Sequence, residues 1–76
     1  ERSMRSKITT EIAGQVWKLV AQPGDDVAAD APIVILESMK MEIPILAPTA
    51  GKLIELHVAE EDMVAEGQLI CVIESR

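Results

Sequence analysis

The sequence predicts an all-β domain in which one strand unit is used twice. The two units would form two small sheets packed face to face or closed into a flattened barrel. The first observation is an internal repeat with an offset of 37 residues, which aligns Gly14 with Gly51 and runs without a gap to Glu37 and Glu74. The second is a series of short runs rich in Val, Ile and Leu, separated by Pro, Gly and Asp. Since the chain has one Trp and no Phe or Tyr, the core must be aliphatic. Two equivalent halves also predict a pseudo-two-fold axis.

Eight strands are expected in chain order, at residues 7–11, 14–20, 26–29, 32–37, 41–46, 51–58, 63–64 and 68–74. The third is either a very short strand or irregular, and the acidic turn at residues 59–62 is open to a single helical turn. Pro44 has no backbone N–H to donate, so its strand is predicted to lie at a sheet edge or to contain a bulge. The expected domain covers residues 7–76 and follows a flexible segment at residues 1–6.

The composition excludes several classes of protein. Seventy-six residues allow one domain with a small core. The net charge of −6 and the lack of an aromatic platform predict no nucleic-acid partner and no anionic membrane surface as partner. No apolar run approaches the ~20 residues of a membrane span, and no signal peptide is recognisable. The lone Cys71 cannot form an internal disulfide, which indicates a reducing compartment, so we expect a cytoplasmic protein.

One short charged stretch, Glu37-Ser38-Met39-Lys40-Met41-Glu42, separates two strand-length apolar runs. This pattern predicts a tight hairpin with Lys40 at or near its tip. Strand alternation would put Met39 and Met41 on one face and Lys40 on the other. Tight primed turns favour Asn, Asp or Gly, because their central residues need positive φ. The stretch contains none of these residues, so a Met-Lys turn would be strained, and strain persists where function requires it. The alternative is a solvated turn lysine between two methionines that fill the core.

The same six residues closely resemble the biotin-attachment motif of biotin carboxyl carrier domains, in the biotinyl/lipoyl attachment family. Lys40 matches the lysine whose ε-amine carries biotin, Met39 and Met41 match its flanking methionines, and Glu37 matches the acidic residue three places before it. Ser38 stands where alanine is commoner. Related lipoyl domains share the hairpin but usually lack the paired methionines. The resemblance extends over residues 8–74.

The resemblance implies a flattened barrel-sandwich of two four-stranded antiparallel sheets, with the termini far from the modified hairpin. It also implies covalent biotin on Lys40, with Met39 and Met41 as flanking recognition residues and Glu37 and Glu42 as candidates for recognition by a biotin protein ligase. The implied carrier takes carboxyl groups from a biotin carboxylase to a carboxyltransferase. The isolated domain is expected to be a monomer, and a mitochondrial matrix location would apply to a eukaryotic carboxylase. Asp30 departs from the family pattern, which usually has glycine there.

Two alternatives to a biotin carrier stay open. One is a lipoyl-type carrier, with lipoate in place of biotin, from a 2-oxo acid dehydrogenase or a glycine cleavage system. The other is an unmodified barrel-sandwich module used for interactions. Biotin is favoured over lipoate by the paired methionines, and a complete Met-Lys-Met hairpin argues against the unmodified module.

The remaining residues offer no catalytic machinery. His57 is the single histidine and has no nearby serine, cysteine or paired carboxylate that would suggest a triad, so we interpret it as an ordinary strand residue. Cys71 lies within an apolar strand and is expected to be a buried, inert thiol. One His and one Cys give no plausible zinc ligand set, and there is no glycine-rich phosphate loop. The chain is therefore predicted not to be an enzyme by itself.

Overall fold

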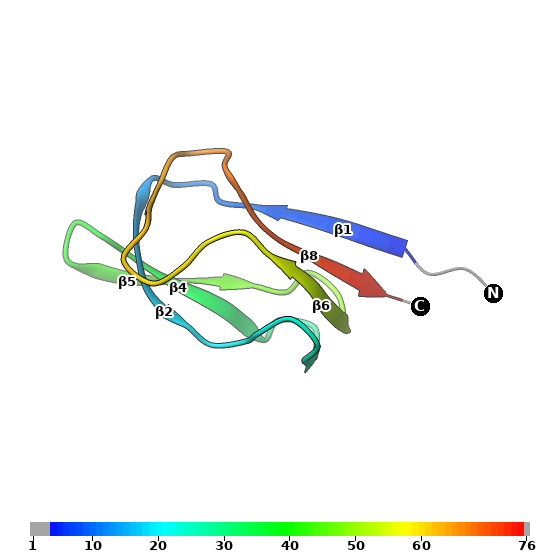
Figure 1. Cartoon of the computed structure of the whole chain (residues 1–76). Coiled ribbons are helices and arrows are strands. Elements are labelled where there is room, and N and C mark those ends of the chain that lie inside the picture. Colours follow the sequence, from blue (N-terminus) through cyan, green and yellow to red (C-terminus); the bar gives the residue numbers. More distant parts are fainter. Residues whose placement is uncertain (1–3, 76) are drawn as a thin grey trace.

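The computed structural model describes residues 4–75, which form two four-stranded antiparallel sheets (Figure 1). In chain order the strands are β1 (Met4–Thr9), β2 (Gly14–Leu19), β3 (Asp26–Val27), β4 (Pro32–Ser38), β5 (Met41–Leu46), β6 (Gly51–Leu56), β7 (Met63–Val64) and β8 (Leu69–Ser75). We call the sheet with order β1-β8-β6-β3 sheet A and the sheet with order β5-β4-β2-β7 sheet B. This architecture confirms the predicted all-β barrel-sandwich. No helix in residues 4–75 could cross a membrane.

The internal repeat becomes a pseudo-two-fold relation between the two sheets. Adding 37 to the residues of β2, β3 and β4 gives β6, β7 and β8, and β1 corresponds to β5 in the same way. Each half donates its short third strand to the other half's sheet. The connecting hydrogen bonds repeat as well: the Val16 N–H donates to the Asp62 carbonyl at 2.8 Å, and the Leu53 N–H to the Asp25 carbonyl at 2.9 Å.

The core between the sheets is aliphatic, as expected. Its buried hydrophobic residues come from both halves: Ile8, Val16, Ala21, Val27, Ile33, Val34, Leu36, Ala47, Leu53, Val58, Val64, Ile70, Cys71 and Ile73. The buried Thr10 hydroxyl donates to the Ile12 carbonyl and accepts from the Ile12 N–H, so it carries no unsatisfied polar atom. Burial of each inner face fixes the register of the strands, since a slip by one residue would turn the apolar set outward.

Several strand boundaries differ from the sequence prediction. β1 begins at Met4 and not at residue 7, because its first residues pair with the end of β8, with Met4 opposite Ser75. Of the segment expected to be flexible, residues 1–3 lie outside the described residues, and residues 4–6 are in this strand. The acidic stretch before β7 forms a turn and no helical turn. Pro44 lies in β5, an edge strand of sheet B, as predicted.

Candidate functional site

The β4–β5 hairpin ends in a two-residue turn with Lys40 at its tip. Ser38 pairs with Met41, which leaves Met39 and Lys40 as the two central residues. Both have positive φ, 53° at Met39 and 66° at Lys40, and this is the signature of a type I′ turn. The turn confirms the prediction of a primed hairpin built without Gly, Asn or Asp. A left-handed conformation costs a non-glycine residue about 1–2 kcal/mol, so the tip is a strained part of the fold.

The side chains at the tip face solvent. Met39 is 92% exposed and Met41 61% exposed, and Lys40 is exposed as well. The interpretation of the methionines as core filler is therefore wrong. The alternation that predicted Met39 and Met41 on one face stops at Ser38, because Met39 itself lies in the turn. The tip thus presents a primary amine with an exposed thioether on each side.

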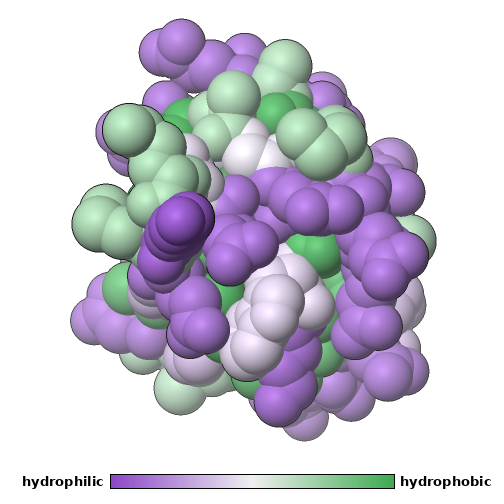
Figure 2. Space-filling model, turned by 90° about the vertical axis from the view of Figure 1, so that its left-hand side faces the viewer, coloured by the Kyte–Doolittle hydropathy of each residue, from purple (hydrophilic) through white to green (hydrophobic). Residues whose placement is uncertain are grey.

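Charge at the base of the hairpin is not balanced by partners within residues 4–75. Glu37 lies directly opposite Glu42 in the β4–β5 pair, and both are exposed. No ion pair or side-chain hydrogen bond joins Glu37, Lys40 or Glu42 to another described residue. Directly opposed like charges destabilise a sheet. Figure 2, which looks onto this end of the molecule, shows apolar groups in green set among hydrophilic ones in purple.

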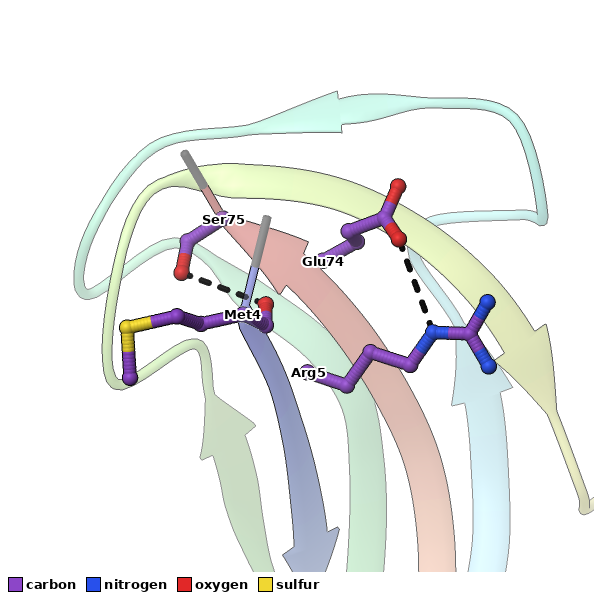
Figure 3. A network of polar contacts seen from close by, with 4 residues as sticks. All are labelled: Met4, Arg5, Glu74 and Ser75. Atoms are coloured by element: carbon purple, nitrogen blue, oxygen red, sulfur yellow. Dashed lines mark hydrogen bonds and ion pairs between the residues drawn. The ribbon is translucent and has the colours of Figure 1, made fainter. Parts of the chain in front are cut away.

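The equivalent place in the other sheet is the end of β1 and β8, drawn in Figure 3. There Arg5 lies opposite Glu74, and its Nε is 3.5 Å from the Glu74 Oε2. The Ser75 hydroxyl donates to the Met4 carbonyl at 3.4 Å. Met4 and Ser75 are the first and last described residues, and Figure 1 shows this end of the molecule opposite the β4–β5 hairpin. The expectation that the ends of the chain lie far from the hairpin is thus met by the described residues.

Of the other candidate residues, His57 was predicted to be a strand residue without a carboxylate partner, and both parts of this prediction are wrong. β6 ends at Leu56, and the His57 Nε2 is 2.8 Å from the exposed Glu55 Oε1. Cys71 is buried in the core, as expected, and burial raises the pKa of its thiol from 9.0 to about 11. Within residues 4–75, no three His, Cys, Asp or Glu side chains are grouped to hold a metal ion. The surface hollows beside Lys52 and beside Pro44 do not include Lys40.

One feature of this site was missed by sequence reasoning. The outer face of sheet B continues from Glu37 and Glu42 to Gln15 on β2 and Met63 on β7. The sequence does contain one indication of this extended face: the 37-residue repeat aligns the apolar Met63 with the charged Asp26. This difference could not be connected with the hairpin from the sequence, because the connection depends on the pairing of β2 with β7, which are strands from different halves.

This arrangement defines a carrier domain: a rigid β-sandwich that presents one lysine on a strained, projecting turn. The Lys40 amine is exposed and makes no ion pair or side-chain hydrogen bond with another residue of the range 4–75. The profile of the family described as "Biotin-requiring enzyme" matches residues 3–73. The chain therefore belongs to this family, and within it the chain is a biotin carboxyl carrier type of domain, not itself catalytic.

Similar proteins include both small chains and large multidomain ones. The chain is 40% identical over 70 residues to the biotinylated protein TB7.3 homolog of Mycobacterium leprae, and this match covers 92% of the chain and 99% of the relative. It is 38% identical over 68 residues to urea amidolyase of Saccharomyces cerevisiae, covering 90% of the chain but only 4% of that protein. Among solved structures, the Kluyveromyces lactis urea carboxylase superposes with a TM-score of 0.88 at 34% identity, covering 96% of the chain and 6% of that protein. The chain thus matches nearly all of a small biotinylated protein and a small part of a urea amidolyase and of a urea carboxylase.

Proposed function

We propose that the Lys40 ε-amine is the attachment point of biotin, bound through an amide. The observation that carries this proposal is the geometry of the tip: an exposed lysine is the second of the two central residues of a type I′ turn, and it lies between exposed methionines. These residues fit the group, since an amine without a partner can enter an enzyme's active site without first breaking a contact. Bound biotin supplies a nitrogen that carries a carboxyl group between two active sites.

The attachment step needs an activated donor from another protein. A biotin protein ligase supplies biotin as its mixed anhydride with AMP. The Lys40 nitrogen attacks the acyl carbon, the new C–N bond replaces the bond from carbon to the phosphate oxygen, AMP leaves and one proton is released. Met39 and Met41 flank the amine as apolar contacts for the ligase, and Glu37 and Glu42 are charged contacts for it at the base of the hairpin.

The loaded domain serves a biotin carboxylase and a carboxyltransferase in turn. A flexible arm on a rigid tip raises the effective concentration of biotin at both active sites. The carboxylases among the similar proteins support this division of labour. Lipoate is the second candidate group, because lipoyl domains share the hairpin. Biotin is favoured by the paired methionines and by the biotinylated relative that matches nearly the whole chain.

Intact-mass measurement after co-expression with an active biotin ligase tests the attachment. We expect one biotin per chain in the wild type and in the control Lys18→Arg, and none in Lys40→Arg. All three should unfold at nearly the same temperature, because both lysines are exposed. Continued labelling of Lys40→Arg would place the attachment elsewhere, and a lipoyl mass on Lys40 in cells that supply both groups would identify a lipoyl carrier.

Labelled bicarbonate tests the division of labour. The fully biotinylated domain alone, with ATP, should acquire no label. Added biotin carboxylase should load it, and added carboxyltransferase should remove the label, whereas Lys40→Arg should support neither step. Label on the domain in the absence of a carboxylase would mean that the domain has an active site of its own.

A further inference from the structure

The two sheets carry the same row of four cross-strand neighbours, but with different side chains. The row on sheet B, which we call the acidic-apolar row, consists of Met63, Gln15, Glu37 and Glu42. The equivalent row on sheet A, which we call the charge ladder, consists of Asp26, Lys52, Glu74 and Arg5. Directly opposed residues of antiparallel strands share one face, so each row crosses the outer face of its sheet.

The charge ladder is complementary within the domain, and the acidic-apolar row is not. Along the ladder the charges alternate in sign, and Arg5 and Glu74 form an ion pair. The acidic-apolar row contains two opposed carboxylates, no cation and a methionine that is 71% exposed. Trp17, at the bulge of β2, adds an aromatic ring that is 50% exposed, and the exposed Lys18 follows it in the same bulge as the nearest cation along β2. Exposed apolar side chains beside unpaired charge of one sign are features of interaction surfaces.

This row lies close to the amine that must be acylated. Glu37 and Glu42 are one residue pair below Ser38 and Met41, and the turn follows directly. At a rise of about 3.4 Å per residue, the row is about 7 Å along the strands from the tip. Before modification Lys40 has only its own four-carbon stem. The enzyme that acylates it must therefore come closer to these strands than an enzyme that handles biotin at the end of the extended arm.

We propose that the enzyme which acylates Lys40 docks on the outer face of sheet B, through the acidic-apolar row and Trp17. Its contacting surface would be basic opposite Glu37 and Glu42, and apolar opposite Met63 and Trp17. The charge ladder on sheet A stays outside the contact. The inference rests on the proposed function, and it adds a recognition surface on β2 and β7, away from the hairpin.

Exchanging the two rows tests this docking. The variant Met63→Asp with Gln15→Lys gives sheet B the side chains of sheet A at two positions and leaves Glu37, Glu42 and the hairpin unchanged. The matched control, Asp26→Met with Lys52→Gln, makes the reverse exchange on sheet A. With a biotin protein ligase, ATP, Mg²⁺ and biotin, we expect kcat/KM to fall about tenfold for the first variant, mainly through KM, and to stay at the wild-type value for the control. The rate at which a biotin N-hydroxysuccinimide ester acylates Lys40 itself, followed by mass spectrometry of the peptide that contains it, should be the same in all three, although the total labelling differs because the exchanges add or remove a lysine elsewhere.

A second measurement does not depend on these substitutions. The Lys40→Arg domain, labelled with 5-fluorotryptophan at Trp17, cannot be acylated at residue 40, and its ¹⁹F chemical shift should change when unlabelled ligase is added, beyond the broadening that slower tumbling of any complex produces. An unchanged chemical shift at saturating ligase would place the contact elsewhere. Equal kcat/KM for the first variant and the wild type, or equal losses in both exchanges, would overturn the docking while the attachment at Lys40 stands. A wild-type domain that the ligase leaves unlabelled would instead remove the proposed function itself.

Discussion

The β4–β5 end and the β1–β8 end of the molecule occupy equivalent positions under the repeat, yet only the first is closed by a turn. At the β1–β8 end, Arg5 faces Glu74 and the strands simply stop at the first and last described residues. At the β4–β5 end, Glu42 faces Glu37, and Met39 and Lys40 complete a left-handed turn. The strand framework is the same, so the difference between the ends lies in side chains and in one turn.

This difference separates what holds the fold together from what makes the site. The β1–β8 end has the charge pairing that stabilises a sheet edge. The β4–β5 end lacks that pairing and includes two residues in a costly conformation. Such local costs persist only where the surrounding structure over-determines them. The aliphatic core, shared by both halves, supplies this support.

The largest expected effect concerns the two glycines at which strands cross closely. A Cβ at residue 14 would lie 2.8 Å from the Glu37 carbonyl oxygen, and a Cβ at residue 51 would lie closer still to the Glu74 carbonyl oxygen. Since both neighbours are backbone atoms that cannot rotate away, we expect Gly51→Ala to cost about 3 kcal/mol of unfolding free energy and Gly14→Ala about 1–2 kcal/mol. Urea denaturation measures both. A larger loss at residue 14 than at residue 51 would mean that the β4–β5 end is the more tightly packed one.

The second effect concerns Cys71, whose counterpart in the first half is Val34, equally buried. Burial raises the thiol pKa to about 11, so the folded protein holds this proton at a pH where the unfolded chain has released it. Stability should therefore be intact below the ordinary thiol pKa of 9.0 and fall as the pH rises toward 11, by about 2 kcal/mol in all.

Replacing Cys71 with the residue of the other half isolates this contribution. Cys71→Val removes the thiol and leaves every other titratable group in place. We expect the slope of unfolding free energy against pH between 9 and 11 to be smaller in Cys71→Val than in the wild type, measured by urea denaturation at each pH. Parallel slopes would show that the thiol does not titrate differently in the two states.

The sequence was sufficient to predict the eight-stranded sandwich and the hairpin. The repeat helped, because a strand assigned in one half supports the assignment of the equivalent strand in the other half. β4 and β5 follow apolar runs that end at a charged stretch, so their bounds were predicted to within one residue. The Met-Lys pair occupies positions at which turn residues are normally required, but the tip was identified from the resemblance of residues 37–42 to the biotin-attachment motif, since the spacing alone also allowed a solvated turn lysine. Sequence alone could therefore identify Lys40 as unusual before any pairing was known.

Features that depend on pairing between halves could not be predicted. The early start of β1 escaped because Met4, Arg5 and Ser6 show no apolar alternation, and they are ordered by pairing with β8 at the far end of the chain. The acidic-apolar row could not be predicted from the sequence for the same reason, because β7 belongs to the second half and pairs with β2 of the first half. The bulge at Trp17 has an equivalent in β6, where the register also shifts after Leu53.

A smaller effect is expected from giving the β4–β5 end the charge pairing of the other end. Glu42→Arg converts the opposed carboxylates into the arrangement found at Arg5 and Glu74. We expect a gain of about 0.5–1 kcal/mol in unfolding free energy, and slower labelling by biotin ligase. The reverse change, Arg5→Glu, should lose a similar amount without slowing ligation. If Glu42→Arg is no more stable than the wild type at low salt, the opposed Glu37 and Glu42 carboxylates do not lower the unfolding free energy of the domain.

The smallest effect concerns two turns in which one half has glycine and the other does not. Gly24 has φ 99° and its counterpart Glu61 has φ 75°, while Gly67 has φ 85° and its counterpart Asp30 has φ 68°. Glycine removes left-handed strain of about 1–2 kcal/mol but adds about 0.5–1 kcal/mol of unfolded-state entropy. We therefore expect Glu61→Gly to gain about 0.5 kcal/mol, and Asp30→Gly to change little, because Asp tolerates this conformation better than Glu.

Thermal unfolding of these two variants, beside the reverse changes Gly24→Ala and Gly67→Ala, measures the asymmetry. Each alanine variant should lose about 1 kcal/mol or more, because no contact compensates for a Cβ in the left-handed region. The Glu61 turn also accepts the Gln15 side chain through its carbonyl at 3.2 Å, a contact that glycine retains. A loss of stability in Glu61→Gly would therefore mean that the Glu61 side chain itself stabilises this turn, and that the strain is offset locally and not by the core.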